Sequence, residues 1–229
     1  MFFYGIDRYF ILFVIPAMIF SLVMQGLVKG TYRKMSRIQN GRRLTGAEAA
    51  ARVLSYYEIN GVAIEGVRGT LSDHYDPRDK VIRLSQGVFA QSTVAAVGIA
   101  CHEAGHAAQH AKGYVPVKLR NALLPVCNVG SALGLPLVFL GYITSFEPLV
   151  TVGLALFALI TLFQLVTLPV EFNASRRALR VIDEQGLLEG EEYKGARSVL
   201  RAAAMTYVAA LVVSIANLLR LLLRFRSRN

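Results

Sequence analysis

Two histidines and a glutamate stand at a spacing suited to metal chemistry. The stretch HEAGH, residues 102–106, follows the uncharged apolar run 93–101. Residues four apart on a helix project from one face about one turn from each other, so His102 and His106 can hold one zinc ion. Glu103 beside them can reach a water on the metal and act as a general base. Because unpaired polar groups are costly to bury, this pattern indicates a zinc-dependent hydrolytic site.

A catalytic zinc takes three protein ligands and leaves one position for water, so a third ligand must come from elsewhere. His110 is too far, because it lies about 12 Å along the helix axis from His102. The remaining histidine, His74, lies in a turn-rich loop. Glu171 is the first charge after a long apolar segment, and we expect it to be the ligand. The alternative is a glutamate favoured there by the helix dipole.

The composition indicates a membrane protein, with 54% apolar and 17% charged residues. A helix crosses a bilayer with about 20 mostly apolar residues. Four segments meet that requirement: 9–28, 121–146, 149–170 and 202–223. The first has no basic stretch before it and is too long for a cleaved signal peptide, so we interpret it as an anchor.

Basic residues predict the orientation of these segments. A cluster follows the first segment: Lys29, Arg33, Lys34, Arg37, Arg42 and Arg43. By the positive-inside rule this cluster and the HEAGH region face the cytoplasm. Four crossings then put Arg224, Arg226 and Arg228 outside, against that rule. Either the early basic cluster dominates the orientation, or the last helix is tilted, re-entrant or partly interfacial.

The net charge of +10 does not point to nucleic acid. The basic residues cluster beside the apolar segments, where anionic lipid head groups attract them, and no zinc-finger or RNA-binding motif is present. The expected partners are the lipid bilayer and a protein or peptide substrate, while the oligomeric state does not follow from the sequence.

The rest of the chain predicts a small α+β unit. Thr45 and Glu48 form a capping box for a helix that stops at Asn60-Gly61. Segment 62–85 predicts two or three short strands in an antiparallel sheet. We expect Ser92 to cap the HEAGH helix, and a further helix over about 170–184.

These predictions divide the chain into five parts. They are an N-terminal transmembrane anchor (1–30), a cytoplasmic zincin-like region with the HEAGH helix (31–116), a transmembrane hairpin (117–168), helices with the third ligand (169–204), and a C-terminal transmembrane helix with a basic tail (205–229). The predicted fold class is a mainly α membrane protein of about four transmembrane helices with a zincin-like catalytic unit.

Three motifs in order, HEAGHAAQHA, the upstream SDHYDPRDKVIRLS and the later PVEFNASRRALRVI, resemble the YugP-type family of membrane-bound neutral zinc metallopeptidases. That family is similar to the HtpX and CAAX prenyl protease group, in which a glutamate on a later helix completes the metal site. The resemblance implies one zinc ion held by His102, His106 and Glu171, with Glu103 as base. It also implies a bacterial source, and hence the inner membrane.

One departure concerns the support of a ligand histidine. The HtpX-like group carries an acidic residue four positions after the ligand glutamate, where this chain has Ser175. We therefore expect Asn173 or Asp183 to supply that support.

The expected reaction is hydrolysis of peptide bonds in membrane or membrane-proximal proteins at the cytoplasmic face, by a zinc-activated water. Tyr75 or His74 is a candidate donor to the oxyanion, and strand 81–85 could offer its edge to an extended substrate. One alternative is a catalytically inactive zinc-containing scaffold or partner-binding protein. A membrane di-iron enzyme is a weaker alternative, because the chain has only four histidines.

Overall fold

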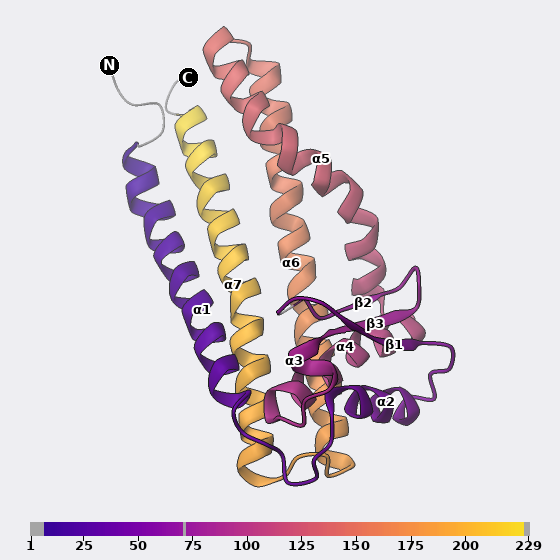
Figure 1. Cartoon of the computed structure of the whole chain (residues 1–229). Helices are drawn as coiled ribbons and strands as arrows, with labels where there is room; N and C mark the ends of the chain where they lie inside the picture. Colours follow the sequence, from indigo (N-terminus) through magenta and orange to yellow (C-terminus); the bar gives the residue numbers. More distant parts are fainter. Residues whose placement is uncertain (1–6, 71, 227–229) are drawn as a thin grey trace. The chain divides into compact units, whose positions relative to one another are not determined.

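The chain forms seven α-helices and one three-stranded sheet within residues 7–70 and 72–226, which are the residues that this computed structural model describes (Figure 1). In chain order the elements are a π-helical turn η1 (Phe10–Val14), α1 (Ile15–Met35), α2 (Gly46–Tyr56), β1 (Ala63–Val67), β2 (His74–Asp76), β3 (Val81–Ser85), α3 (Gln86–Phe89), α4 (Val94–Ala111), α5 (Val115–Thr144), α6 (Glu147–Glu184) and α7 (Gly190–Arg226).

Two compact units are built from these elements. The span unit comprises Met1–Gln25, Lys118–Pro169 and Thr206–Asn229, and the core unit comprises Gly26–Val117 and Val170–Met205. Long helices pass from one unit to the other, so α6 and α7 each contribute to both.

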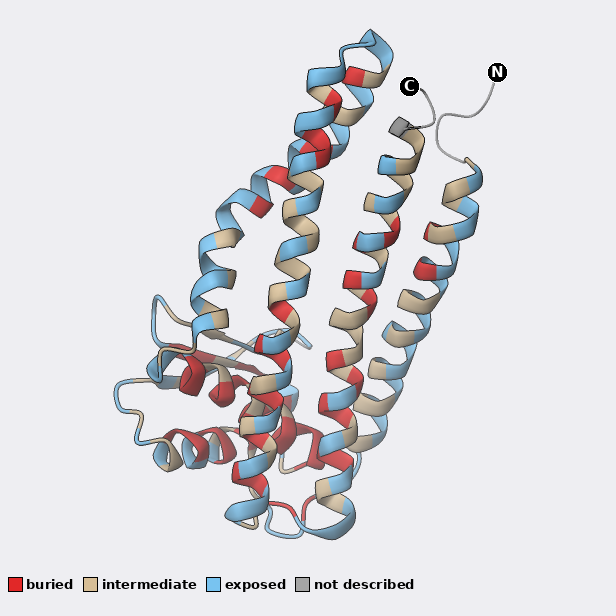
Figure 2. Cartoon of the chain, turned by 180° about the vertical axis from the view of Figure 1, so that it is seen from behind, coloured by how far each residue is buried: buried red, intermediate tan, exposed pale blue. Residues whose placement is uncertain are grey.

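Among the described residues, four helices are long and apolar enough to cross a membrane, as predicted: Phe10–Met35, Val115–Thr144, Glu147–Glu184 and Gly190–Arg224. In the span unit large apolar side chains point outward, and Leu22 is 65% exposed. Figure 2 shows these helices mostly in the colours of exposed and intermediate residues. So much apolar surface is expected against lipid rather than water.

The arginine that interrupts the last apolar segment has a counter-ion within the span unit. Arg220 Nε and Arg224 Nη1 each lie 3.0 Å from Asp7 Oδ2. The Arg220 guanidinium also lies over the Phe10 ring, 4.8 Å from its centroid. These contacts place the start of the first helix beside the end of α7. Pairing lowers the cost of burying the charges among apolar helices.

The core unit holds a mixed sheet, not the antiparallel sheet that we predicted. Its order is β1-β3-β2, with β1 parallel and β2 antiparallel to β3. The difference arises because the turn-rich segment contains β2, which forms a hairpin with β3 through residues 77–80. The chain reverses direction between β1 and β2, which lies on the far side of β3, and reverses again in the hairpin, so β1 and β3 run the same way.

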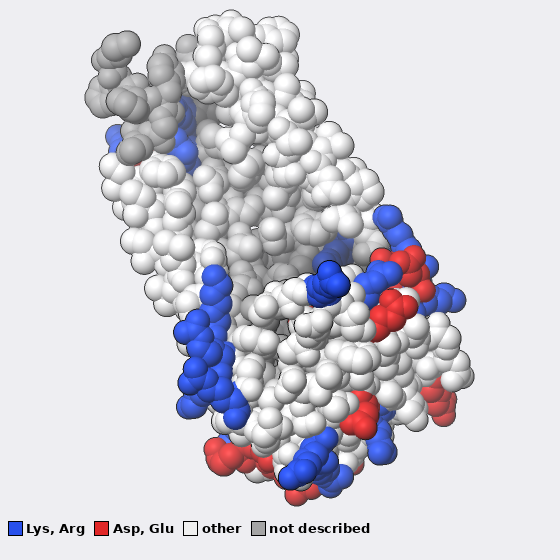
Figure 3. All heavy atoms as spheres, viewed as in Figure 1, with Lys and Arg blue, Asp and Glu red and all other residues white. Residues whose placement is uncertain are grey.

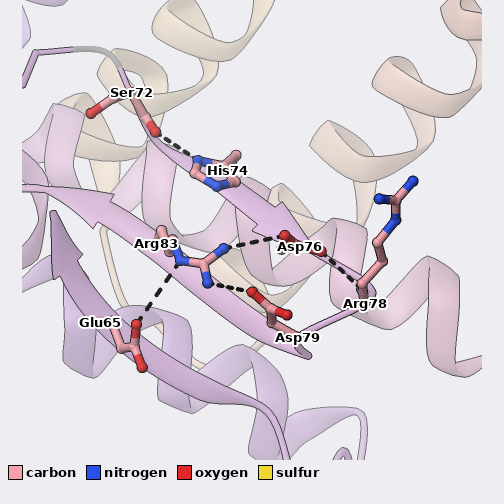
Figure 4. Close-up of polar contacts among 7 residues, drawn as sticks. All are labelled: Glu65, Ser72, His74, Asp76, Arg78, Asp79 and Arg83. Carbon is pink, nitrogen blue, oxygen red and sulfur yellow. Dashed lines mark hydrogen bonds and ion pairs between the residues drawn. The ribbon is translucent and has the colours of Figure 1, made fainter.

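Strand β3 is paired on both sides, so the expectation that it offers an edge to a substrate is wrong. Its Arg83 holds the sheet together at the surface (Figure 4). The guanidinium lies 3.2 Å from Asp76 of β2, 2.6 Å from Asp79 of the hairpin turn and 4.0 Å from Glu65 of β1.

Buried aliphatic residues of the sheet and helices form the core of this unit. Val53 of α2, Ile82 and Leu84 of β3 and Val97 of α4 all have no exposed surface. The predicted capping box is present at the start of α2, where the Thr45 side chain accepts a hydrogen bond from the Glu48 N–H. Figure 2 shows buried residues concentrated in these elements.

Candidate metal centre

Helix α4 carries both histidines on one face. Its N-cap is Thr93, whose hydroxyl accepts a hydrogen bond from the Ala96 N–H at 3.2 Å. The predicted cap, Ser92, instead donates to the backbone oxygen of Arg43. Nε2 of His102 lies 3.1 Å from Nε2 of His106, one turn further on. The i, i+4 spacing therefore brings the two ring nitrogens to one point.

A close approach of two helices brings a carboxylate to these nitrogens. A Cβ on Gly105 would lie only 2.7 Å from the Ala174 backbone oxygen, so only glycine lets α4 and α6 meet here. One turn before Ala174, α6 presents Glu171, whose side chain is 3% exposed. Its Oε2 lies 3.4 Å from His102 Nε2 and 3.5 Å from His106 Nε2.

This triad, His102, His106 and Glu171, fits a zinc ion. It is the group of three possible metal-binding side chains found among the residues that the structure describes. Tetrahedral zinc with bonds of about 2.0–2.1 Å separates its ligand atoms by about 3.3–3.4 Å. The observed separations of 3.1, 3.4 and 3.5 Å are close to that spacing. Two imidazoles and one carboxylate are also the donor types of catalytic zinc sites.

The outer nitrogen of each ring has a partner. His106 Nδ1 lies 3.0 Å from Gln109 Oε1, and His102 Nδ1 lies 3.1 Å from Ser175 Oγ. Ser175 thus contacts a ligand directly, although we expected the support to come from elsewhere. Sequence reasoning also missed Gln109. Its signal is an uncharged polar residue three positions after His106, in a helix whose other polar side chains are three histidines and Glu103.

The two residues predicted to support a ligand histidine lie at different distances from the site. Asn173 Oδ1 accepts a hydrogen bond from Gln109 Nε2 at 3.1 Å and so lies one step removed from His106. Asp183 is exposed and lies twelve positions after Glu171, or about 18 Å further along the helix. The structure therefore brings Asn173, and not Asp183, to the site.

Glu103 is buried beside the triad, at 9% exposure. Among the described residues none hydrogen-bonds to its carboxylate, so this group is not committed to a structural role. Burial acts to lower the pKa of His106, but the facing Glu171 carboxylate and the charge of Glu103 outweigh it, and the pKa is raised. Negative charge thus concentrates where a metal cation would sit.

The predicted oxyanion donors lie in different surroundings. Tyr75 of β2 is half-buried, and its hydroxyl lies 3.1 Å from Nδ1 of His110, one turn beyond His106 on α4. His74 is exposed, and its Nδ1 lies 2.8 Å from the backbone oxygen of Ser72 (Figure 4). The structure brings Tyr75 to the helix that carries the ligands, but does not bring His74 into the group.

Comparison with known proteins gives the same picture as the three sequence motifs. A family model described as "Putative neutral zinc metallopeptidase" matches residues 10–226. A curated relative from Bacillus subtilis (strain 168), described as "Putative membrane protease YugP", is 43% identical over 217 residues, which is 94% of this chain and 96% of the relative. No solved structure matches the chain significantly. The chain therefore belongs to the neutral zinc metallopeptidase family that this model describes.

Proposed function

We propose that the chain is a membrane-embedded zinc metalloendopeptidase that hydrolyses peptide bonds of membrane or membrane-proximal proteins. The observation that carries this proposal is the triad of His102, His106 and Glu171 with an uncommitted, buried Glu103 beside it. Three ligands leave one position for water, whereas a structural zinc site is usually closed by four, often cysteines. Both cysteines are buried in apolar surroundings, and neither belongs to the triad.

The proposed reaction needs a Lewis acid, which the metal would supply, and proton transfer, which the protein's side chains carry out. A zinc ion held by the triad would supply a Lewis acid that acidifies water and polarises the scissile carbonyl. Glu103 accepts the proton of the attacking water on its carboxylate and delivers it to the nitrogen of the leaving amine. Tyr75 is the better candidate to donate a hydrogen bond to the oxyanion, because its hydroxyl already reaches the ligand helix.

The proposed location is the cytoplasmic face of a bacterial inner membrane. The basic cluster at residues 29–43 follows the first span directly and leads into the core unit, so the positive-inside rule puts both on the cytoplasmic side. The contacts of Asp7 with Arg220 and Arg224 bring the start of the first helix to the end of α7, which favours both on one side of the membrane, as four crossings require. With the early basic cluster in the cytoplasm, that side is the outer one. Arg228 lies outside the described residues.

The decisive variant is Glu103→Gln in the purified, detergent-solubilised protein. We expect about one zinc per chain in the wild type and in the variant, because Glu103 is not a ligand. Cleavage of casein or of a membrane-protein substrate should fall about 10²–10⁴-fold, the usual contribution of a general base. Glu191→Gln is the control, since Glu191 is an exposed glutamate that pairs with the neighbouring Lys194, which is also exposed. Undiminished proteolysis by Glu103→Gln would exclude this residue as the base.

A further inference from the structure

A fully buried amide links the two helices that carry the triad. Gln109 of α4 has no exposed surface, and both ends of its side chain are engaged. Its Oε1 lies 3.0 Å from His106 Nδ1, and its Nε2 lies 2.7 Å from the backbone oxygen of Val170, the residue before Glu171. A buried amide is costly unless its hydrogen bonds are made, and here they join one ligand to the segment that carries another.

The direction of each hydrogen bond follows from the types of its partners. Arg177 Nε donates at 2.8 Å to the side chain of Asn173, and a guanidinium can only donate, so the receiving atom is Oδ1. Gln109 faces this oxygen at 3.1 Å and the Val170 carbonyl at 2.7 Å, and two acceptors require its NH₂ group. The amide oxygen of Gln109 therefore faces His106, whose Nδ1 must carry the proton.

When Nδ1 of neutral His106 carries the proton, the other ring nitrogen has a lone pair that can bind a metal ion. That nitrogen, Nε2, is the atom that faces Glu171 at 3.5 Å. The two histidines differ in this respect, because the Ser175 hydroxyl beside His102 can either donate or accept. The network thus selects a tautomer at His106 and leaves His102 free to take either one.

We propose that Arg177, Asn173 and Gln109 form a positioning chain that holds His106 in its metal-binding tautomer and holds α4 against α6. These residues do not touch substrate. The positioning chain acts through His106, so this proposal rests on the proposed function only in taking His106 as a zinc ligand. Polar groups of this kind behind a ligand histidine are worth about 10–100-fold in metal affinity.

Two sets of variants test the positioning chain. Gln109→Met keeps the length of the side chain and removes all three of its hydrogen bonds. Asn173→Asp keeps an acceptor for both Arg177 and Gln109, whereas Asn173→Leu removes it. The matched control is Asn40→Met, because Asn40 is another buried amide of the core unit. Within the described part of the chain its side chain hydrogen-bonds only to the Leu44 backbone.

The readouts are the zinc dissociation constant, from competition with a chelator, and the ¹⁵N shifts of His106 in the metal-free protein. We expect Gln109→Met to bind zinc about 10–100-fold more weakly and to show a mixture of His106 tautomers, and Asn173→Leu to weaken binding more than Asn173→Asp. Asn40→Met should lose stability but keep its zinc affinity.

Zinc affinity of Gln109→Met within about twofold of wild type would overturn the proposal, as would an equal loss in Asn40→Met. If Gln109→Met does not fold, the comparison of Asn173→Asp with Asn173→Leu decides. Equal zinc affinities of these two variants would overturn the proposal. A wild type that binds no zinc would instead contradict the proposed function, so the two failures are distinguishable.

Discussion

The span unit and the core unit are both rich in apolar residues but place them in opposite ways. Leu22 of the span unit is 65% exposed, whereas Leu84 of the core unit has no exposed surface. Charges show the reverse distribution. In Figure 3 the visible surface of the span unit is nearly all white, while blue and red side chains gather on the core unit. The difference indicates two solvents, lipid around the first unit and water around the second.

Truncation of one leucine in each unit should give the largest contrast in stability. Leu84→Ala removes a side chain buried in the sheet and should cost about 2–5 kcal/mol of unfolding free energy. Leu22→Ala faces the surrounding lipid or detergent and leaves no cavity, so we expect a loss below about 1 kcal/mol. Thermal unfolding in detergent measures both. Equal losses would contradict the assignment of Leu22 to a lipid-facing surface.

Removal of a carboxylate should show the next largest difference. Asp7→Asn leaves two arginines of the span unit without this counter-ion and should cost about 1–3 kcal/mol, less than a fully buried pair because these groups are partly exposed. Glu191→Gln breaks an exposed pair with Lys194 and should cost about 0–1 kcal/mol. Melting temperatures of the two variants compare these costs, and a smaller effect for Asp7→Asn would show that the pairing contributes little.

A methyl group added to a glycine tests the packing that forms the site. In Gly105→Ala the new Cβ would lie 2.7 Å from the Ala174 backbone oxygen, so α4 and α6 must separate. We expect a loss of about 1–3 kcal/mol and much weaker zinc binding. Gly134→Ala in the span unit meets its nearest atom at 3.6 Å, an ordinary contact, and should be tolerated. Unchanged zinc affinity in Gly105→Ala would mean that the helices need not approach so closely.

The smallest effect is expected at the start of α2, where a helix end meets water. Thr45→Ala removes the capping hydroxyl and should cost about 1 kcal/mol. The Thr45 N–H and the Thr45 hydroxyl both donate to the Glu48 carboxylate and lower the pKa of Glu48 below its ordinary value. The contribution of the bond from the hydroxyl is therefore present above the ordinary carboxylate pKa and is lost as pH falls through the lowered value. The difference in unfolding free energy between wild type and Thr45→Ala should be smaller at acid pH than at neutral pH; a constant difference would exclude this coupling.

Features that depend on neighbouring residues could be predicted from the sequence. The four apolar helices follow from length and composition, and the capping box from residues three apart. The HEAGH spacing alone places two imidazoles on one face. Glu171 could be proposed because a third ligand was missing and its position after an apolar segment was unusual.

Features that depend on distant contacts could not be predicted in the same way. Strand β2 is three residues long and lies in a turn-rich segment, so its pairing with β3 leaves little trace in the composition. The parallel pairing of β1 with β3 depends on where the chain crosses. The link from Gln109 to Asn173 spans 64 positions and exists only because Gly105 lets two helices meet.

The proposed zinc site has one ion held by His102, His106 and Glu171. X-ray absorption at the zinc edge of the loaded wild-type protein tests it most directly, with Glu171→Ala as the comparison. We expect about one zinc per chain with nitrogen and oxygen neighbours at about 2.0–2.2 Å, and a loss of bound zinc in Glu171→Ala. A sulfur neighbour at about 2.3 Å, or full zinc occupancy without the Glu171 carboxylate, would contradict it.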